Sequence, residues 1–197
     1  GFDSLESLSG ERCQPFDLAR QGINIGEGAA LFLLSREPAP LALLGVGESS
    51  DAWHISAPHP EGIGAEAAMR MALAQGGIAP EEVGYLNLHG TATRLNDAME
   101  SQAVHRLFGN RVPCSSTKAL TGHTLGAAGA IEAALACLLL ECALPLPPQR
   151  VTSADPALAP IRLVSGTTHL AAPRVLSNSF AFGGNNVSLL FGSVHHE

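Results

Sequence analysis

One histidine stands in a segment whose residue types suit proton or oxyanion chemistry. His89 lies in residues 87–93 (NLHGTAT), directly after a predicted strand. Proteins of the α/β class place site residues in glycine-containing loops at strand ends, and imidazole is a donor or base near neutral pH. Thr91 and Thr93 alternate, so both hydroxyls could face one channel. A buried, fully hydrogen-bonded histidine beside two turn threonines would give the same pattern, so this segment alone leaves the choice open.

A second histidine ends a segment that also holds a lysine, residues 115–123 (SSTKALTGH). Lys118 is one of only 11 basic residues and has small and apolar neighbours. We expect His123 to lie in the first turn of the following helix, where the helix dipole disfavours the imidazolium. A neutral ring there can donate an N–H to a developing oxyanion. A solvated lysine followed by a capping histidine is the alternative interpretation.

The third segment, residues 177–186 (SNSFAFGGNN), places two aromatic residues before a Gly-Gly turn between predicted strands. Glycine permits positive φ and a close backbone approach. A backbone N–H exposed in this turn could serve an oxyanion hole, and Phe182 could gate an apolar acyl pocket. Such turns are common between strands, so this segment carries weight only together with the other two.

Elements that could hold these segments follow from length, composition and pattern. The chain has 197 residues and is 46% hydrophobic, enough to bury a sizeable core. Asp97 and Glu100 resemble a capping box at the start of one helix. The order of elements predicts an α/β sandwich with a largely parallel, buried sheet. The predicted helices are 64–75, 97–108 and 121–141, and the predicted strands include 29–34, 41–46, 83–88, 111–115, 163–164, 175–179 and 187–191.

Composition argues against several other classes. The net charge is −7 and no basic run occurs, so nucleic acid and anionic lipid are not expected partners. The longest strictly apolar run, 133–140, is eight residues, whereas a bilayer-spanning helix needs about 20. The four cysteines form no CxxC pair, which predicts reduced thiols and a cytoplasmic protein. The histidines lack the spacing of a metal site, and none is expected.

Together the three segments resemble the β-ketoacyl–acyl carrier protein synthases. The motifs are His-Gly-Thr at 89–91, Lys118 with Thr-Gly-His at 121–123, and Asn-Ser-Phe-x-Phe-Gly-Gly at 178–184. Residues 15–17 (PFD) and 26–28 (GEG) are also similar to that family. The resemblance covers the later half of such an enzyme. It implies a thiolase-like fold of two α/β halves, each with a mixed five-stranded sheet and helices on both faces. We expect residues 1–56 to end the first half and residues 57–197 to form the second.

The resemblance implies an acyltransferase that performs a decarboxylative Claisen condensation in the synthesis of fatty acids, polyenes or polyketides. Malonyl on acyl carrier protein loses CO₂, and the resulting enolate attacks an acyl group held as a thioester on a cysteine. That cysteine would lie upstream of Gly1, so we expect the isolated 197 residues to be inactive. The protein would hold no cofactor, because phosphopantetheine arrives on the carrier protein. A homodimer or a synthase-like heterodimer is implied.

Catalytic roles also follow from the resemblance. His89 and His123 would donate hydrogen bonds to the enolate oxygen. Lys118 would orient or polarise the groups around this pair, with Glu100 as its charge partner, because a lone buried ammonium is costly.

Binding roles are implied for the remaining motif residues. Thr91 and Thr93 would hydrogen-bond the pantetheine arm. The backbone N–H of Phe182, in the loop with Gly183, would be one donor of the oxyanion hole, and the phenyl ring would gate the acyl pocket.

Departures from the usual motifs leave the pathway open. Ala92, residues 94–96 (RLN), Ala181 and Asn185 replace Ser, Pro-x-Gly, Gly and Thr, so a specialised polyketide-like or aryl-polyene pathway is as tenable as bulk fatty acid synthesis. A non-catalytic subunit similar to a chain length factor is the main alternative, although the retained histidines and lysine argue against it. A thiolase fits less well, because residues 182–186 (FGGNN) lack the second catalytic cysteine of that class.

Overall fold

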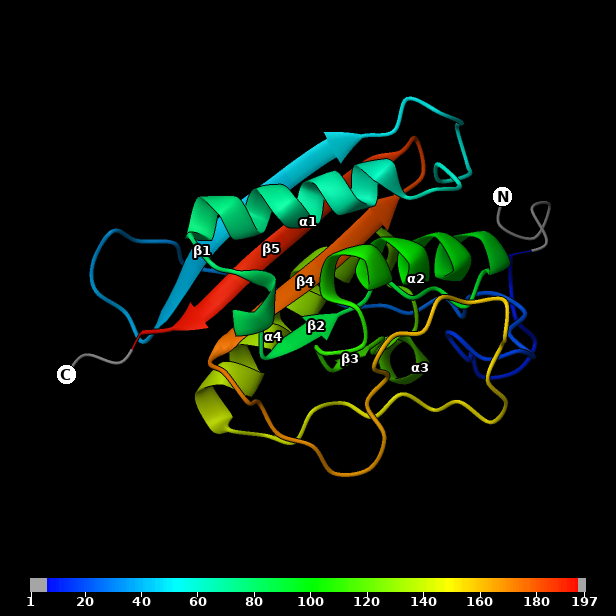
Figure 1. Cartoon of the computed structure of the whole chain (residues 1–197). Coiled ribbons are helices and arrows are strands. Elements are labelled where there is room, and N and C mark those ends of the chain that lie inside the picture. The colour runs from blue at the N-terminus through cyan, green and yellow to red at the C-terminus, as the bar shows by residue number, and fades with distance from the viewer. Residues whose placement is uncertain (1–6, 195–197) are drawn as a thin grey trace.

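The computed structural model describes residues 7–194, which contain one mixed sheet of five strands in the order β1-β5-β4-β2-β3 (Figure 1). β4 pairs with β2 and β2 with β3 in parallel, whereas β5 runs antiparallel to both β1 and β4. The five strands and their mixed directions agree with what the resemblance implied. The largely parallel sheet predicted from the order of elements is wrong, because β5 is antiparallel to both of its neighbours. The strands are β1 (Leu41–Ser50), β2 (Tyr85–Asn87), β3 (Cys114–Ser115), β4 (Arg174–Ala181) and β5 (Asn185–Ser193).

Helices cover both faces of the sheet, as the resemblance implied (Figure 1). One core joins α1 (Ile63–Gly76) and α2 (Arg94–Phe108) to one face, and the other joins α4 (Ala128–Cys142) to the opposite face. Neighbouring residues of a strand point to opposite faces, so Leu86 belongs to the first core and Tyr85 to the second. The short helices are η2 (Pro80–Glu82), α3 (Lys118–Thr121) and η3 (Leu125–Ala127).

Close contact between β1 and α1 depends on two glycines. A Cβ atom on Gly45 or Gly47 would collide with the backbone carbonyl oxygens of Ala72 and Ala68 in α1. Both alanines are fully buried. The strand and the helix therefore approach to a distance that only these small residues permit, which fixes the helix on this part of the sheet.

Several predicted elements differ from the structure. Residues 29–34 form no strand, because no other segment among residues 7–194 pairs with them, and Leu31 and Leu33 are almost fully exposed. Residues 163–164 contribute only an isolated bridge from Leu163 to Cys114. The helix predicted at 121–141 is broken into α3, η3 and α4, because Gly122 has a φ of 71° and ends α3.

The predicted capping box of α2 is also wrong. The helix begins at Arg94 with Thr93 as N-cap. Asp97 and Glu100 are completely buried in its first turns, and each accepts backbone N–H groups from other segments instead of capping the helix.

The first strand bears on the expected boundary between the two halves. β1, which lies within the expected first unit of residues 1–56, is a strand of the same sheet as β2–β5, and the boundary at residue 56 stays a prediction.

Among residues 7–194, one helical stretch, 125–142, is long and apolar enough to cross a membrane by length and composition alone. Its buried residues Ala133, Ala136 and Leu139 pack on the sheet.

Candidate active site

The predicted site residues meet at the carboxyl ends of the parallel strands. His89 follows β2, and His123 follows β3 after the short helix α3. Since β2 and β3 are neighbours in the sheet, the two loops lie at the same edge. Both rings line one cavity of about 940 Å³, to which Thr91, Thr93 and Phe182 also contribute.

The two imidazole rings are in contact. Their centroids are 5.3 Å apart and their planes meet at 83°. The His89 side chain is 5% exposed, and its ring also lies 6.0 Å from that of Phe180. Residues that are 34 positions apart in the sequence are thereby brought to one point.

Hydrogen bonds define which nitrogen of each ring carries the proton. Lys118 Nζ lies 3.4 Å from Nδ1 of His89, and an ammonium can only donate, so this Nδ1 accepts. The Nδ1 of His123 accepts the N–H of Leu125 at 3.2 Å. In both neutral rings the proton is therefore on Nε2, and each ring has one N–H left to donate.

Both rings are held neutral. Burial lowers the pKa of His89 well below its usual value, and the charge of Lys118, together with the charge that His123 would carry if protonated, lowers it further. Burial and the nearby Lys118 lower the pKa of His123 to about 4. Removing an imidazolium from water and placing it beside an ammonium both disfavour the charged form, so neither ring is protonated near pH 7.

His123 is positioned by a distant segment, not by the helix turn that the sequence predicted. It lies between α3 and η3. Its backbone N–H donates to the Asn24 carbonyl at 2.7 Å, and its carbonyl accepts the Gly26 N–H at 3.1 Å. The low pKa of His123 therefore arises from burial and Lys118, and not from a helix dipole.

The charge partner of Lys118 is Glu132, and the predicted pairing with Glu100 is wrong. Lys118 and Glu132 are 1% and 2% exposed, and Nζ lies 2.5 Å from Oε1. Glu132 lies in α4, which places its carboxylate beneath the lysine. A buried ammonium in contact with a carboxylate avoids the large cost of an unpaired buried charge.

Glu100 instead holds the loop that carries His89. Its two carboxylate oxygens accept the N–H groups of His89 at 2.8 Å and Gly90 at 2.7 Å. Burial is the main cause that raises its pKa to about 7. The sequence contained a signal for this role. Asp97 and Glu100 are three positions apart, so they share one face of the helix, and in the structure that face is turned toward the loop of His89.

Asp97 is the other carboxylate on this face of α2. Its oxygens accept the N–H of Phe16 at 2.8 Å and that of Ala92 at 3.2 Å. It therefore ties the loop after β2 to the segment around residue 16, and α2 positions the histidine loop with two carboxyl groups as acceptors.

The two threonines of the loop are neighbours in space, as their alternation predicted. Thr91 Oγ1 and Thr93 Oγ1 are 2.8 Å apart and hydrogen-bonded. Both residues line the cavity, so their hydroxyls are available to a polar group that enters it.

The turn between β4 and β5 forms another part of the cavity wall. Gly183 and Gly184 have φ values of 83° and 78°, which residues with a Cβ rarely adopt. Phe182 is half exposed and lines the cavity. The N–H of Gly183 donates to the Ile55 carbonyl at 2.8 Å.

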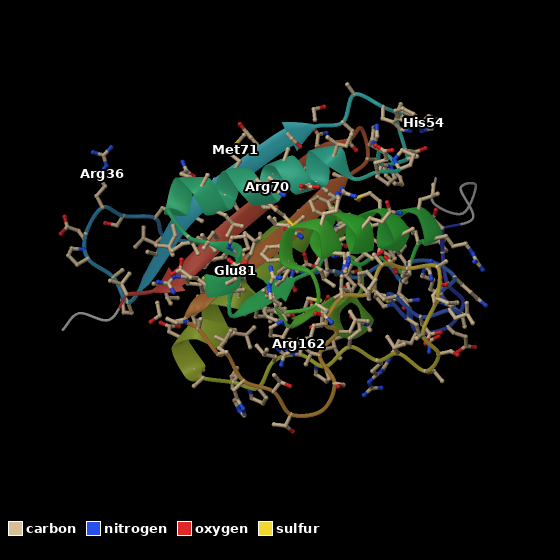
Figure 2. The ribbon with its side chains drawn as sticks, in the orientation of Figure 1. Arg36, His54, Arg70, Met71, Glu81 and Arg162 are labelled. Atoms are coloured by element: carbon tan, nitrogen blue, oxygen red, sulfur yellow. The ribbon has the colours of Figure 1, made fainter. Side chains whose placement is uncertain are left out.

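Sequence analysis missed the loop after β1. Asp51 accepts hydrogen bonds from Asn186 Nδ2 at 2.8 Å and from the His59 N–H at 2.9 Å. Asp51 and His54 both line the cavity, and Figure 2 shows His54 in this loop beyond the end of β1. The polar composition of residues 49–60 predicts a loop. It does not indicate that this loop lies against the turn between β4 and β5.

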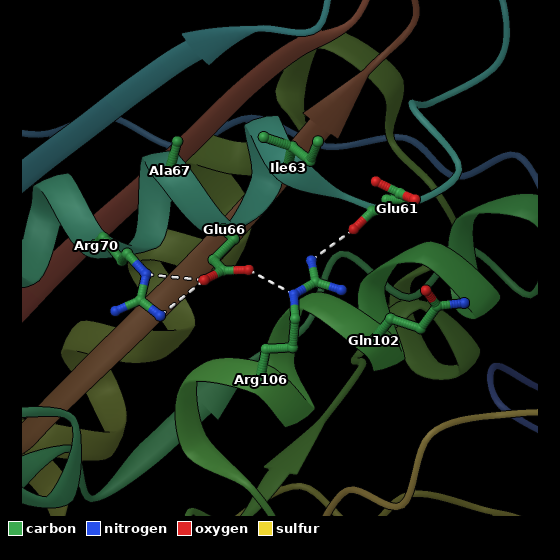
Figure 3. A pocket seen from close by; sticks show the side chains of 7 residues that line it. All are labelled: Glu61, Ile63, Glu66, Ala67, Arg70, Gln102 and Arg106. Carbon is green, nitrogen blue, oxygen red and sulfur yellow. Dashed lines mark hydrogen bonds and ion pairs between the residues drawn. The ribbon is translucent and has the colours of Figure 1, made fainter.

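A second hollow of about 550 Å³ lies between α1 and α2 (Figure 3). Glu66 pairs there with Arg70 at 2.7 Å and with Arg106 at 2.6 Å, while Arg106 also donates to the Glu61 carbonyl. None of the predicted site residues lines it. Glu66 pairs with both arginines, so we interpret the hollow as a surface ion-pair network that joins two helices.

The four cysteines are free thiols, with Cys13 and Cys114 buried. Cys114 lies on β3, and Cys137 and Cys142 lie on α4. Within residues 7–194 no group of three histidine, cysteine, aspartate or glutamate side chains could hold a metal ion.

Comparison with known proteins gives consistent matches. Residues 42–150 match the family model described as "Beta-ketoacyl synthase, C-terminal domain". The 3-oxoacyl-[acyl-carrier-protein] synthase 2 of Synechocystis sp. is 37% identical over 97% of this chain and 50% of the relative, and that of Staphylococcus aureus is 35% identical over the same shares. The chain thus spans about half the length of the curated relatives it matches.

Solved structures of high similarity are ketosynthases. The structure of the ketosynthase ApeO in complex with its chain length factor ApeC from Xenorhabdus doucetiae aligns with a TM-score of 0.93 and 58% identity, over 98% of this chain and 49% of that one. The ishigamide ketosynthase/chain length factor aligns with a TM-score of 0.87 and 31% identity, over 98% and 50%. The thiolase-like fold expected from the sequence is the fold of these proteins.

Proposed function

Because the chain belongs to the β-ketoacyl synthase family, we propose that it supplies the decarboxylation part of a condensing-enzyme active site. The full-length enzyme is a 3-oxoacyl-[acyl-carrier-protein] synthase, an acyltransferase that joins malonyl and acyl thioesters. The observation that carries this proposal is the pair of neutral, contacting imidazoles in one cavity, each with its Nδ1 occupied.

The chemical need is to stabilise a thioester enolate. When the malonyl thioester loses CO₂, the electrons of the broken C–C bond move into the thioester, and negative charge develops on its oxygen. His89 and His123 each donate an Nε2–H to that oxygen. A preorganised donor of this kind contributes about 2.7–4 kcal/mol to the transition state. Because neither ring must lose or gain a proton, both act as donors throughout the step.

Lys118 acts through the histidines and not on the substrate. It is absent from the cavity lining and lies behind His89. Its hydrogen bond to Nδ1 holds the tautomer that presents Nε2–H, and its charge disfavours protonation of both rings.

Condensation needs an acyl group near the enolate carbon. We assign the acyl-holding cysteine to the part of the relatives' length that this chain does not span. The carbanion attacks the acyl carbonyl, the C–S bond to the cysteine breaks, and the acyl chain grows by two carbons. The backbone N–H of Phe182 stabilises the oxyanion of this step, its ring gates the acyl cavity, and the Gly183 N–H holds the turn in place.

Substrates reach the cavity as thioesters of phosphopantetheine on acyl carrier protein, with Thr91 and Thr93 hydrogen-bonded to the arm. The protein itself carries no cofactor. The structures named above contain ketosynthases with a chain length factor, which supports a heterodimer of this kind, or a homodimer, in the cytoplasm. Residues 92, 94–96, 181 and 185 support a specialised polyene or polyketide pathway as well as fatty acid synthesis.

The test is the substitution His123→Ala in the full-length enzyme. We expect malonyl-carrier-protein decarboxylation to fall by about 100-fold or more, while acylation of the cysteine continues. His169→Ala, which changes an exposed histidine outside the cavity, is the matched control and should leave both steps unchanged. Near-normal decarboxylation by the His123 variant would refute the proposed role of the histidine pair.

A further inference from the structure

Resting on this proposed function, we propose that Arg94 binds the phosphate of the phosphopantetheine arm at the mouth of the cavity. Arg94 is the first residue of α2 and directly follows Thr93, one of the two threonines in the cavity wall. It lines the same cavity as His89 and His123. Arg94 is exposed, whereas His89 is buried, so the arginine lies toward solvent and the reacting centre lies deeper.

Charge in the cavity lining favours an anion. The chain as a whole has a net charge of −7, yet the charged residues that line this cavity are two arginines and one aspartate, namely Arg20, Arg94 and Asp51. The lining thus carries one more positive than negative charge, in a protein that is negative overall, and local positive charge attracts an anionic ligand. The thioester substrate has an anionic phosphate in its arm.

Two of the three charges are held by close partners, whereas the charge of Arg94 acts only at longer range, on Asp155, whose pKa it helps to lower. Arg20 is bound to Asp155 at 2.6 Å and to the Asp17 carbonyl at 2.8 Å. Asp51 is held by Asn186 and His59. Among residues 7–194, no hydrogen bond or ion pair engages the guanidinium of Arg94. Its donors therefore remain available to a ligand at the cavity mouth.

The position of Arg94 also runs against the usual preference of helices. The first turn of a helix carries partial positive charge and favours anionic side chains, so a cation there is unfavourable. Asp97 in the same turn is engaged with Phe16 and Ala92. A bound phosphate would remove the conflict, because both the arginine and the helix start attract it, and a guanidinium can donate two parallel hydrogen bonds to phosphate.

The malonyl carboxylate is a less suitable ligand. It is separated from the thioester carbonyl by a single carbon, so it must lie near the buried histidines when CO₂ leaves. Phosphate is at the other end of the long pantetheine arm, where the cavity opens. The exposure of Arg94 fits the phosphate end.

The test compares the unmodified full-length enzyme with its Arg94→Ala variant, each on a substrate with and a substrate without the phosphate. Decarboxylation is measured with malonyl-pantetheine, which lacks phosphate, and with malonyl-phosphopantetheine. We expect Arg94→Ala to lower kcat/KM about tenfold for the second compound, mainly through KM, and to leave the first unchanged. Arg94→Lys should restore part of the loss. Arg36→Ala is the matched control, since Arg36 lies at the far end of the molecule from His54 and the cavity loop (Figure 2).

Equal losses of kcat/KM with malonyl-pantetheine and malonyl-phosphopantetheine would overturn the proposal, because the effect of Arg94 would then not depend on the phosphate. Malonyl-CoA and malonyl-acyl carrier protein separate the two sources of the same arm. A loss with the carrier protein that equals the loss with malonyl-phosphopantetheine supports the proposal. A loss with the carrier protein alone would assign Arg94 to the carrier surface and refute it, as would a loss with malonyl-CoA alone.

Failure of the proposed function gives a different result. If the unmodified enzyme decarboxylates none of these compounds, binding of phosphopantetheine itself can still be measured by calorimetry. Weaker binding of phosphopantetheine, but not of pantetheine, to the Arg94→Ala variant would keep the phosphate site while the condensing role is abandoned. Unchanged binding of both would refute the phosphate site.

Discussion

His89 and His123 have similar surroundings but are held by different parts of the molecule. The loop of His89 is fixed by the Glu100 carboxylate below it, whereas His123 is fixed by backbone hydrogen bonds to Asn24 and Gly26. Lys118 affects both rings: its charge is the second cause, after burial, of the lowered pKa of each histidine. The two donors thus share an electrostatic environment while their positions are set independently.

This environment predicts an unusual pH dependence. A histidine is neutral above its pKa, and the pKa of His123 is about 4, so decarboxylation should persist as pH falls through 6.5 and be lost only near pH 4. Lys118→Met removes the second cause of the shift, so the acid limb should move upward, toward the ordinary histidine value. The measurement is kcat for malonyl decarboxylation against pH, with Arg36→Met as control. An acid limb near pH 6.5 in the unmodified enzyme would contradict the prediction.

The buried pair of Lys118 and Glu132 predicts a large effect on stability. Glu132→Gln leaves a buried ammonium without its counter-charge and should lower the free energy of unfolding by about 3–5 kcal/mol. Replacing both residues, Lys118→Met with Glu132→Leu, should recover much of that loss. Urea denaturation of the full-length protein measures both changes.

A half-exposed ion pair provides the control for this comparison. Glu82 lies 3.8 Å from Arg174, and both are substantially exposed, so Glu82→Gln should cost only about 0–1 kcal/mol. If Glu132→Gln were as mild as Glu82→Gln, the buried pair would not matter to stability.

Residue types in the sequence were sufficient to find the histidines, the threonines and the lysine, but not the partner of the lysine. Glu100 and Glu132 lie 18 and 14 positions from Lys118, and neither separation says which helix turns its carboxylate toward Nζ. That choice depends on how α2 and α4 pack on opposite faces of the sheet. Pairing across helices is a tertiary property, and local periodicity carries no information about it.

Elements were predicted well where a single pattern was long. α1, α2 and the β4–β5 hairpin appear close to their expected positions. The predicted helix from 121 to 141 failed because its first turns are interrupted by Gly122 and by Leu125, whose φ is 53°. Backbone hydrogen bonds to residues 24 and 26 outweigh the local helical preference there, and such distant partners are not visible in a short window of sequence.

Packing of α1 on β1 predicts that Gly47 tolerates no side chain. Gly47→Ala would place a methyl group against the carbonyl of Ala68, so the helix must shift, and the free energy of unfolding should fall by about 1–3 kcal/mol. Gly10→Ala is the matched control, because no atom lies near the corresponding Cβ position. Thermal denaturation compares the two, and equal midpoints would contradict the packing argument.

At the scale of the whole molecule, several leucines are strongly exposed. Leu31, Leu33 and Leu34 are 98%, 96% and 75% exposed, and Leu138 of α4 is 45% exposed. Three leucines this exposed within four positions of one segment are typical of a segment that contacts another part of a protein. The chain spans about half the length of its relatives, so this segment is a candidate for contact with the remaining part of such a protein.

We therefore predict that the isolated 197 residues show no condensing activity and bind a hydrophobic dye more strongly than the full-length enzyme does. The proposed cysteine is absent from the isolated chain, and its apolar surface has no cover. The measurements are product formation from malonyl- and acyl-carrier protein, and dye fluorescence at equal concentration. Turnover to a β-ketoacyl product by the isolated chain would refute the first part.

The place of β5 in the sheet has a consequence for biosynthesis. It is the last of the described strands to leave the ribosome, yet it lies second in the sheet and joins β1 to β4. More than a hundred residues are translated between β1 and β5, and during that time β1 has no strand to pair with. A message that ends before the codon for Asn185 would encode both histidines but would leave β1 separate from β4, β2 and β3, so we expect its product to be degraded and to be inactive.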